Sequence, residues 1–421
     1  MSDLQSKIKI IEEELSKENF EEAKIKIRNL LKKHSKLPYL YFLHGIILDR
    51  ENEFEYTKIA YKKAIKLQPD FIDAHYNLAS LFYRNRLAKE AIIHYKKTIE
   101  LKPDFVQAYL DLGSAFKYLK NFDEAIHYYR KALELNPNLE GGYIRLGGAL
   151  QDNGQYKEAI PYLKRYGVAS KARALECMYA IKDFAEYNNY LAELSETNPI
   201  NLRAATISAY ASSQLNIKNI YPFCKNPLEH IYTINIKSYL KPLNTSDFTK
   251  EILNFKDFWE ESGAVTVGAF KTPGNIFDYK SKCILKLKQI ILNQLKKYKE
   301  KFSKSEDFII TRWPKLFKLY GWHVRYLKKG MQKHHIHPDG WISGSFYIKM
   351  PKNISNNEGA IQFNIRGFNY PIHNKEKKIP NFEYVPKNGD LVLFPSSLFH
   401  NTVPYSSDEQ RQMIAFDIRP Q

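Results

Sequence analysis

Small residues recur along the first 170 residues of the chain with a period of 34 positions. Gly45, Ala79, Gly113 and Gly147 are spaced at this interval and define one register of the pattern. A second register also carries small residues: Ala23, Thr57, Ala91, Ala125 and Ala159. Small side chains let two helices approach closely. The pattern therefore predicts a repeated unit made of two packed helices.

Prolines mark the joins between these units, at Pro69, Pro103 and Pro137. Proline ends the second helix of a unit because it cannot continue the hydrogen-bond ladder. This recurrence resembles the tetratricopeptide repeat, which implies a superhelical solenoid whose concave face binds a protein or peptide partner. A scaffold that only spaces or dimerises the remainder is the alternative. The expected units are a capping unit at 1–34 and repeats at 35–68, 69–102, 103–136 and 137–170.

The strict period ends near residue 170, although the helical pattern continues. Residues 171–225 are expected to form further helical pairs and a solenoid cap or linker. Two prolines interrupt the periodicity between Ile217 and His230, which places a domain boundary there. From residue 226 to 421, helices precede a series of short alternating strands. This order predicts a β-barrel braced on one side by helices.

Length and composition agree with a chain of two or three globular domains. The chain has 421 residues and a formal net charge of +18. Its lysines are spread over predicted helix faces, so we expect solvated surfaces and no nucleic-acid partner. It lacks an apolar run long enough to span a membrane, and its charged N-terminus is unlike a signal peptide. Three dispersed cysteines indicate a reducing compartment, and we expect a cytoplasmic protein.

Three histidines crowd into four positions between two predicted strands. His335 and His337 are two residues apart, so on or beside a strand they point to one side, whereas His334 faces away. Two neutral imidazoles on one side can bind a first-row transition metal. A third imidazole is available further along the chain, because His400 follows the apolar run GDLVLFPSSLFH. Arg411 comes eleven residues after it and opens another strand-like run.

This order resembles the double-stranded β-helix oxygenases that use Fe(II) and 2-oxoglutarate. The pattern HxHPxGWxSGxxYxxxP, followed by GDLVLFPSxxxH, is more closely similar to the oxygenases of this kind that often follow tetratricopeptide repeats. The resemblance covers residues 321–420. It implies a multidomain protein with an N-terminal all-α solenoid (1–170) and a C-terminal jelly-roll with flanking helices (226–421).

The resemblance also implies roles for individual residues. The metal ligands would be His335, His337 and His400, binding Fe(II) with sites open for 2-oxoglutarate and O₂. The family commonly has an acid as its second ligand, and His337-Pro338-Asp339 offers that register, so Asp339 stays open as an alternative. Arg411 would pair bidentately with the distal carboxylate of 2-oxoglutarate. The hydroxyl of Tyr347 would help to hold the same cosubstrate.

The leading hypothesis is a 2-oxoglutarate- and Fe(II)-dependent dioxygenase, a hydroxylase whose repeats recruit a protein or peptide target. One alternative keeps the metal and the barrel but does not use 2-oxoglutarate, as in a cupin-like enzyme. The other is a non-enzymatic adaptor with a vestigial barrel. The residues do not identify the substrate, the partner of the solenoid or the oligomeric state.

Overall fold

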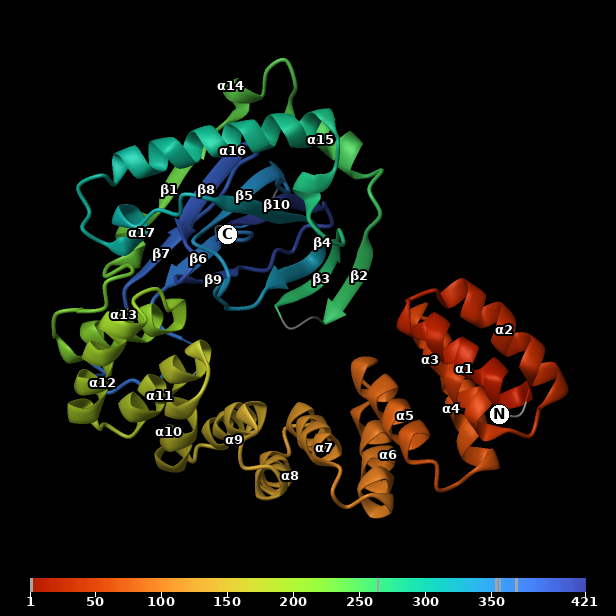
Figure 1. Ribbon diagram of the computed structural model, residues 1–421. Coiled ribbons are helices and arrows are strands. Elements are labelled where there is room, and N and C mark those ends of the chain that lie inside the picture. The colour runs from red at the N-terminus through yellow and green to blue at the C-terminus, as the bar shows by residue number, and fades with distance from the viewer. Residues whose placement is uncertain (1–2, 263–264, 353–354, 356, 368–369) are drawn as a thin grey trace. The chain divides into compact units, whose positions relative to one another are not determined.

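The computed structural model describes residues 3–262, 265–352, 355, 357–367 and 370–421. It divides into two compact units, Met1–Ser170 and Lys171–Gln421 (Figure 1).

The first unit consists of antiparallel helix pairs. Each predicted repeat is one pair, and the first helix of a pair packs on the second. The helices are α1 (Asp3–Ser16), α2 (Phe20–Lys33), α3 (Pro38–Arg50), α4 (Phe54–Leu67), α5 (Ile72–Arg84), α6 (Ala88–Leu101), α7 (Val106–Tyr118), α8 (Phe122–Leu135), α9 (Glu140–Asp152) and α10 (Tyr156–Arg165).

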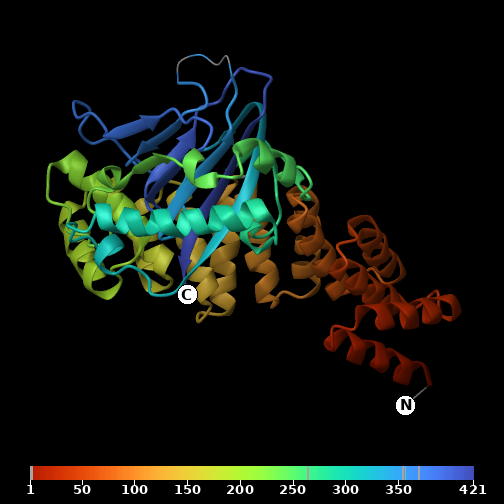
Figure 2. The same cartoon turned by 90° about the horizontal axis from the view of Figure 1, so that it is seen from above.

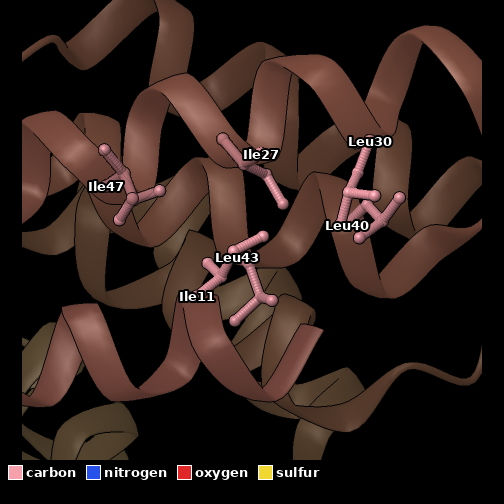
Figure 3. Packing of buried hydrophobic residues seen from close by; sticks show 7 residues of the cluster. Ile11, Ile27, Leu30, Leu40, Leu43 and Ile47 are labelled. Atoms are coloured by element: carbon pink, nitrogen blue, oxygen red, sulfur yellow. The ribbon is translucent and has the colours of Figure 1, made fainter. Parts of the chain in front are cut away.

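Helices α1 and α2 occupy the place of the expected capping unit and bury an aliphatic cluster against α3. Figure 3 shows side chains from all three helices meeting in this cluster. Ile11 of α1, Ile27 of α2 and Ile47 of α3 are each 0% exposed. Burial of apolar surface therefore ties the N-terminal pair to the first regular repeat.

The glycine register places a helix backbone directly against a ring of its partner helix. A methyl group added at Gly113 of α7 would lie 2.7 Å from Cε1 of Tyr129 in α8 and 3.2 Å from the carbonyl oxygen of Ala125. Tyr129 is 1% exposed, so its ring cannot swing into solvent. The regular spacing of small residues along the chain thus follows from close helix contact.

The second unit begins with three helices, α11 (Val168–Ala180), α12 (Phe184–Thr197) and α13 (Leu202–Leu215). They pack against later parts of the chain. Thr206 Oγ1 donates to the Ser397 carbonyl at 2.9 Å, and Tyr370 Oη donates to Glu176 at 2.9 Å. The helical segment 171–225 therefore lies in the same compact unit as the strands that follow it.

Two antiparallel sheets form the body of the second unit, in the jelly-roll arrangement predicted from the sequence. The larger sheet has the strand order β1-β8-β5-β10-β4-β3-β2, and the smaller has the order β7-β6-β9. The strands are β1 (Tyr232–Asn235), β2 (Phe258–Ser262), β3 (Thr266–Lys271), β4 (Phe317–Gln332), β5 (Ile342–Lys349), β6 (Ile361–Asn364), β7 (Asn381–Tyr384), β8 (Asp390–Pro395), β9 (Phe399–Thr402) and β10 (Arg411–Pro420).

Helices cover one face of the larger sheet, with α16 lying across it (Figures 1 and 2). Phe346 of β5 packs on Phe248 of α15, and Phe416 of β10 packs on Phe277. Strand side chains alternate between faces. The even-numbered residues of β10 and of residues 342–347 in β5 therefore face the helices, and the odd-numbered residues there face the interior of the jelly-roll. The flanking helices are α14 (Lys237–Leu240), α15 (Thr245–Ile252), α16 (Lys282–Lys301) and α17 (Phe308–Thr311).

Within the part of the chain that the structure describes, none of the helices combines the length and the apolar character needed to cross a membrane.

A pair of glycine substitutions tests the packing of the repeats. Gly113→Ala should lower the free energy of unfolding by about 1–3 kcal/mol, because the added methyl overpacks the contact with Tyr129. Gly141→Ala is the matched control, since nothing lies within 4 Å of the methyl position in α9. There the better helix propensity of alanine should raise the free energy of unfolding by roughly 0.5–1 kcal/mol. Urea unfolding followed by far-UV circular dichroism measures both, and equal effects at the two positions would contradict the packing argument.

Candidate metal centre

Three buried imidazoles converge in the interior of the jelly-roll. His335 and His337 lie in the segment between β4 and β5, and His400 lies on β9. They are 7%, 8% and 4% exposed, and their ligand nitrogens all lie within 4.8 Å of one another. The Nε2 atoms of His335 and His337 are 3.0 Å apart.

Backbone hydrogen bonds hold the segment that carries the first two histidines. His335 and His400 exchange both of their backbone hydrogen bonds, each at 3.1 Å. The backbone N–H of His337 donates to the Ser396 carbonyl at 3.1 Å. The segment is therefore extended and pinned beside β9, although it is not itself a long strand.

The hydrogen bonds of the rings fix which nitrogen carries the proton. Nδ1 of His335 lies 2.7 Å from the Lys333 carbonyl, and Nδ1 of His400 lies 3.1 Å from the Leu398 carbonyl. A carbonyl oxygen can only accept, so each Nδ1 is the protonated donor and each neutral ring presents its lone pair at Nε2.

The ring of His337 is oriented in the same sense by a carboxylate. Its Nδ1 faces Oδ1 of Asp417, a residue of β10 that is 1% exposed. Three Nε2 atoms with lone pairs thus point toward one region.

Lone pairs repel unless a proton or a cation lies between them. Two nitrogens bound at about 2.1 Å and at right angles to a metal would be about 3.0 Å apart. The donor set therefore fits a first-row transition metal.

Burial keeps the rings of His335 and His400 in the neutral form that binds metal. Loss of hydration lowers the pKa of His335 to about 3, and it also lowers the pKa of His400. Burial acts to raise the pKa of Asp417, but the contact with His337 and the hydrogen bonds from His337 and Ser343 outweigh it and lower that pKa. Asp417 is therefore ionised when it accepts from His337.

The two neighbouring candidates lie apart from this convergence. His334 faces away, as predicted: its ring stacks on Phe399 with centroids 4.7 Å apart, and its Nε2 donates to the Arg366 carbonyl. Asp339 is exposed and lines a pocket beside the imidazoles, and its carboxylate is not in the convergent group formed by described residues.

Cys224, His230 and Asp307 form a second buried group of potential ligands. Here Nδ1 of His230 faces the Asn226 carbonyl and the Cys224 thiol, so it carries a proton. Burial raises the pKa of Cys224, which keeps the thiol protonated. Because both Nδ1 of His230 and the Cys224 thiol carry protons, we interpret this second group as a structural cluster held by hydrogen bonds.

Arg411, at the start of β10, is 1% exposed. Its guanidinium lies between the rings of Tyr326 and Tyr347, with Cζ 5.3 Å from each centroid. Its Nη2 lies 3.7 Å from Met413 Sδ, and its Nε and Nη1 have no hydrogen-bond partner. No carboxylate among the described residues pairs with it. Burying a cation without a partner costs free energy, which an anionic partner would offset.

Tyr347 lies beside this guanidinium on β5 and is fully buried. Its hydroxyl also lacks a hydrogen-bond partner. Burial raises the pKa of Tyr347, so the phenol keeps its proton and can donate. Arg411 and Tyr347 thus form one donor cluster in the interior.

Sequence reasoning did not find Asp417. A carboxylate in the final strand is typical of a surface position, and only the pairing of β10 with β5 brings it to His337. The signal that could have found it is its position six residues after Arg411, because residues six positions apart on a strand lie on the same face.

Residues 321–417 match the family model described as "Putative 2OG-Fe(II) oxygenase". Three tetratricopeptide repeat models match residues 60–85, 106–139 and 141–166. No curated protein matches the chain. The predicted recognition is confirmed: matches to tetratricopeptide repeat models precede a match to the 2OG-Fe(II) oxygenase model.

Solved structures resemble part of the chain at low sequence identity. Pseudomonas aeruginosa pilF is 19% identical, covering 49% of this chain and 96% of that chain with a TM-score of 0.41. YrrB, titled a TPR protein with an unusual peptide-binding site, is 18% identical, covering 42% and 95% with a TM-score of 0.39. MamA from Desulfovibrio magneticus RS-1 is 19% identical, covering 39% and 93% with a TM-score of 0.37.

Metal titration of variants decides the second ligand. His335→Ala should lower the affinity for Co(II), used in place of Fe(II), by at least about a hundredfold, because one of three converging lone pairs is lost. Asp339→Ala should leave the affinity unchanged. Anaerobic absorption titration on the full chain measures both. Loss of binding in Asp339→Ala with retention in His335→Ala would favour the alternative ligand pair.

The carboxylate behind His337 should matter for affinity as well. Asp417→Asn should weaken Co(II) binding by about 10–100-fold, because the amide removes the negative charge that orients the ring and increases its basicity. Asp390→Asn is the control: Asp390 is a buried carboxylate of β8 that accepts from Tyr384 and Asn235 and does not contact the imidazoles. The same titration on both variants checks this expectation, and an equal loss in both would contradict it.

Proposed function

We propose that the C-terminal unit is an Fe(II)- and 2-oxoglutarate-dependent dioxygenase that hydroxylates its substrate, with His335, His337 and His400 as metal ligands. The repeats recruit the protein or peptide target. When bound, Fe(II) supplies O₂ activation: one oxygen atom enters a substrate C–H bond, and the other converts 2-oxoglutarate to succinate and CO₂.

The observation that carries the proposal is the buried guanidinium of Arg411. Three imidazoles alone would suit several metal enzymes, whereas a buried cation without a carboxylate partner in the same interior favours an anionic ligand. Guanidinium offers a planar fork that matches a carboxylate in two hydrogen bonds. Arg411 therefore holds the distal carboxylate of 2-oxoglutarate, and the Tyr347 hydroxyl donates a further hydrogen bond.

Strand β10 connects the two ends of this site. Arg411 and Asp417 both lie on its inner face, and Asp417 is hydrogen-bonded to His337. Between them on that face lie Met413, which pairs with Tyr347 and contacts Arg411, and Ala415, which pairs with Ser345 of β5. The small side chains of Ala415 and Ser345 lie on the part of this stretch nearer Asp417, which suits a short dicarboxylate extended from the metal to Arg411.

Each protein group has a separate task in this proposal. The carbonyls behind His335 and His400 and the carboxylate of Asp417 hold the three rings with Nε2 inward. Arg411 sets the orientation of the cosubstrate along the sheet. The surrounding apolar residues exclude water, which strengthens these polar contacts.

A second function is favoured by the composition of the imidazole cluster. The convergent group among the described residues contains three histidines and no carboxylate. A cupin-like metal enzyme that does not use 2-oxoglutarate would fit such a ligand set. In that enzyme Arg411 would hold the carboxylate of the substrate itself.

The substitution Arg411→Met separates these functions. Under the proposed function it should reduce 2-oxoglutarate-dependent succinate release by at least about a hundredfold, while Co(II) affinity is unchanged. Without 2-oxoglutarate, the free energy of unfolding of the same variant should exceed that of the wild type by about 1–4 kcal/mol, because an unpaired buried cation is replaced by an apolar side chain. Succinate quantification with Fe(II) and ascorbate, together with urea unfolding, measures the two effects.

Arg411→Lys provides the matched comparison, since it keeps the charge and loses the fork. It should retain partial succinate release. Wild-type protein that binds Co(II) but releases no succinate would favour the cupin-like alternative. Wild-type protein that binds no metal would favour the adaptor.

A further inference from the structure

Two serine hydroxyls form a hydrogen-bonded chain behind the carboxylate that orients His337. Ser343 lies on β5, and Ser396 directly follows β8. Ser343 Oγ donates to Oδ1 of Asp417 at 2.8 Å, and Ser396 Oγ lies 2.8 Å from Ser343 Oγ. Both serines are 0% exposed. The chain therefore runs from the end of β8 through β5 and β10 to the imidazole.

The direction of the protons in this chain is fixed at its carboxylate end. An ionised carboxylate can only accept, so the single proton of the Ser343 hydroxyl is committed to Asp417. The oxygen of Ser343 is then the acceptor, and the hydroxyl of Ser396 donates to it. Oδ1 of Asp417 receives two bonds, from Ser343 and from Nδ1 of His337, while its Oδ2 lies 3.5 Å from Arg419 Nη2. These contacts favour a single orientation of the carboxylate, with Oδ1 on the side of His337.

Ser396 also holds the backbone of His337. Its carbonyl accepts from the His337 N–H at 3.1 Å, and its own N–H donates to the Trp341 carbonyl at 3.3 Å. Gly340 leaves space for the hydroxyl of Ser396: a methyl group added there would lie 2.5 Å from Ser396 Oγ and 3.3 Å from Cβ of Asp417. Ser396 therefore contacts His337 at its backbone directly and at its ring through two further side chains.

We infer that Ser343 and Ser396 are positioning residues of the candidate metal centre, which act through Asp417 to keep Nε2 of His337 turned toward the other two imidazoles. The inference rests on the proposed function for the metal, and it adds two residues to the three ligands and Asp417. Because both serines are fully buried, a deleted hydroxyl would leave its partner short of a donor that bulk water does not replace. The carboxylate would then lose its fixed orientation, and the ring would lose it too.

Co(II) titration of single variants of the full chain tests this role. Ser343→Ala should weaken Co(II) binding by about tenfold, because a hydrogen bond behind a metal-binding histidine is lost. Ser396→Ala should weaken it by about 3–10-fold, since it removes one neutral hydrogen bond further from the ring. Ser397→Ala is the matched control and should leave the affinity unchanged. The Ser397 hydroxyl is also buried, but it has no hydrogen-bond partner among the described residues.

A double-mutant cycle separates positioning from a general loss of stability. In an Asp417→Ala background Ser343 has no carboxylate to act on, so adding Ser343→Ala should change the Co(II) affinity by less than about twofold. Independent effects that multiply in the double variant would overturn the inference. A loss of affinity in Ser397→Ala equal to that in Ser343→Ala would overturn it too.

Proton NMR of the Co(II)-loaded protein reports on the ring itself. Each bound imidazole should give an exchangeable, paramagnetically shifted Nδ1–H signal, and the signal that Asp417→Asn displaces belongs to His337. Ser343→Ala should displace the same signal and speed its exchange with water, while the signals of His335 and His400 stay in place. Displacement of all of these signals, or of none, would count against the positioning role.

Succinate release by the same preparations keeps this inference apart from the proposed function. Wild-type protein that releases no succinate, together with a coupled loss of Co(II) affinity in the variants, would support the positioning chain and refute the dioxygenase. Succinate release by the wild type, together with independent effects of Ser343→Ala and Asp417→Ala, would refute only the chain.

Discussion

Two backbone hydrogen bonds between His335 and His400 hold distant parts of the chain side by side, and the candidate metal centre depends on them. Once they are made, the rings of both residues fold back on the carbonyl two positions earlier in their own segments, at Lys333 and Leu398. Each segment therefore supplies the acceptor that turns its own Nε2 inward. His337 has no such local acceptor at Nδ1, and β10 provides one in Asp417.

The repeats could be predicted from the sequence because a steric requirement repeats with them. A small residue is needed where a buried ring of the partner helix lies against the backbone, as Tyr129 does at Gly113. The sequence also predicted that His335 and His337 would point together. In the structure this comes from an extended segment held by β9 and by the Ser396 carbonyl, rather than from a place within a long strand.

Other features could not be predicted because they depend on long-range pairing. Asp417 becomes a partner of His337 only when β10 lies between β4 and β5. The helices α11 to α13 continue the helical pattern of the repeats, yet polar contacts such as Tyr370 with Glu176 and Thr206 with Ser397 join them to the strands. The periodicity of the sequence predicts the helices, but it does not show which later residues they contact.

The position of Arg411 opposes the stability of the unit that contains it. Flanking rings offset part of the desolvation of its guanidinium, but two of its nitrogens lack acceptors. A ligand that supplied the missing negative charge would offset this cost. Binding of a dicarboxylate would then stabilise the folded state as well as position the cosubstrate.

A bulge next to Arg411 decides which residue of β5 lies beside the guanidinium. Over most of their length β10 and β5 pair in one register, with Asp417 opposite Ser343 and Met413 opposite Tyr347. Continued without interruption, that register would place Lys349 opposite Arg411 on the inner face, and two cations would repel. The register shifts between Gln412 and Met413, so Lys349 pairs with Gln412 instead. Because a shift of one residue moves a side chain to the other face, the bulge removes the competing cation and leaves Tyr347 as the neighbour of Arg411.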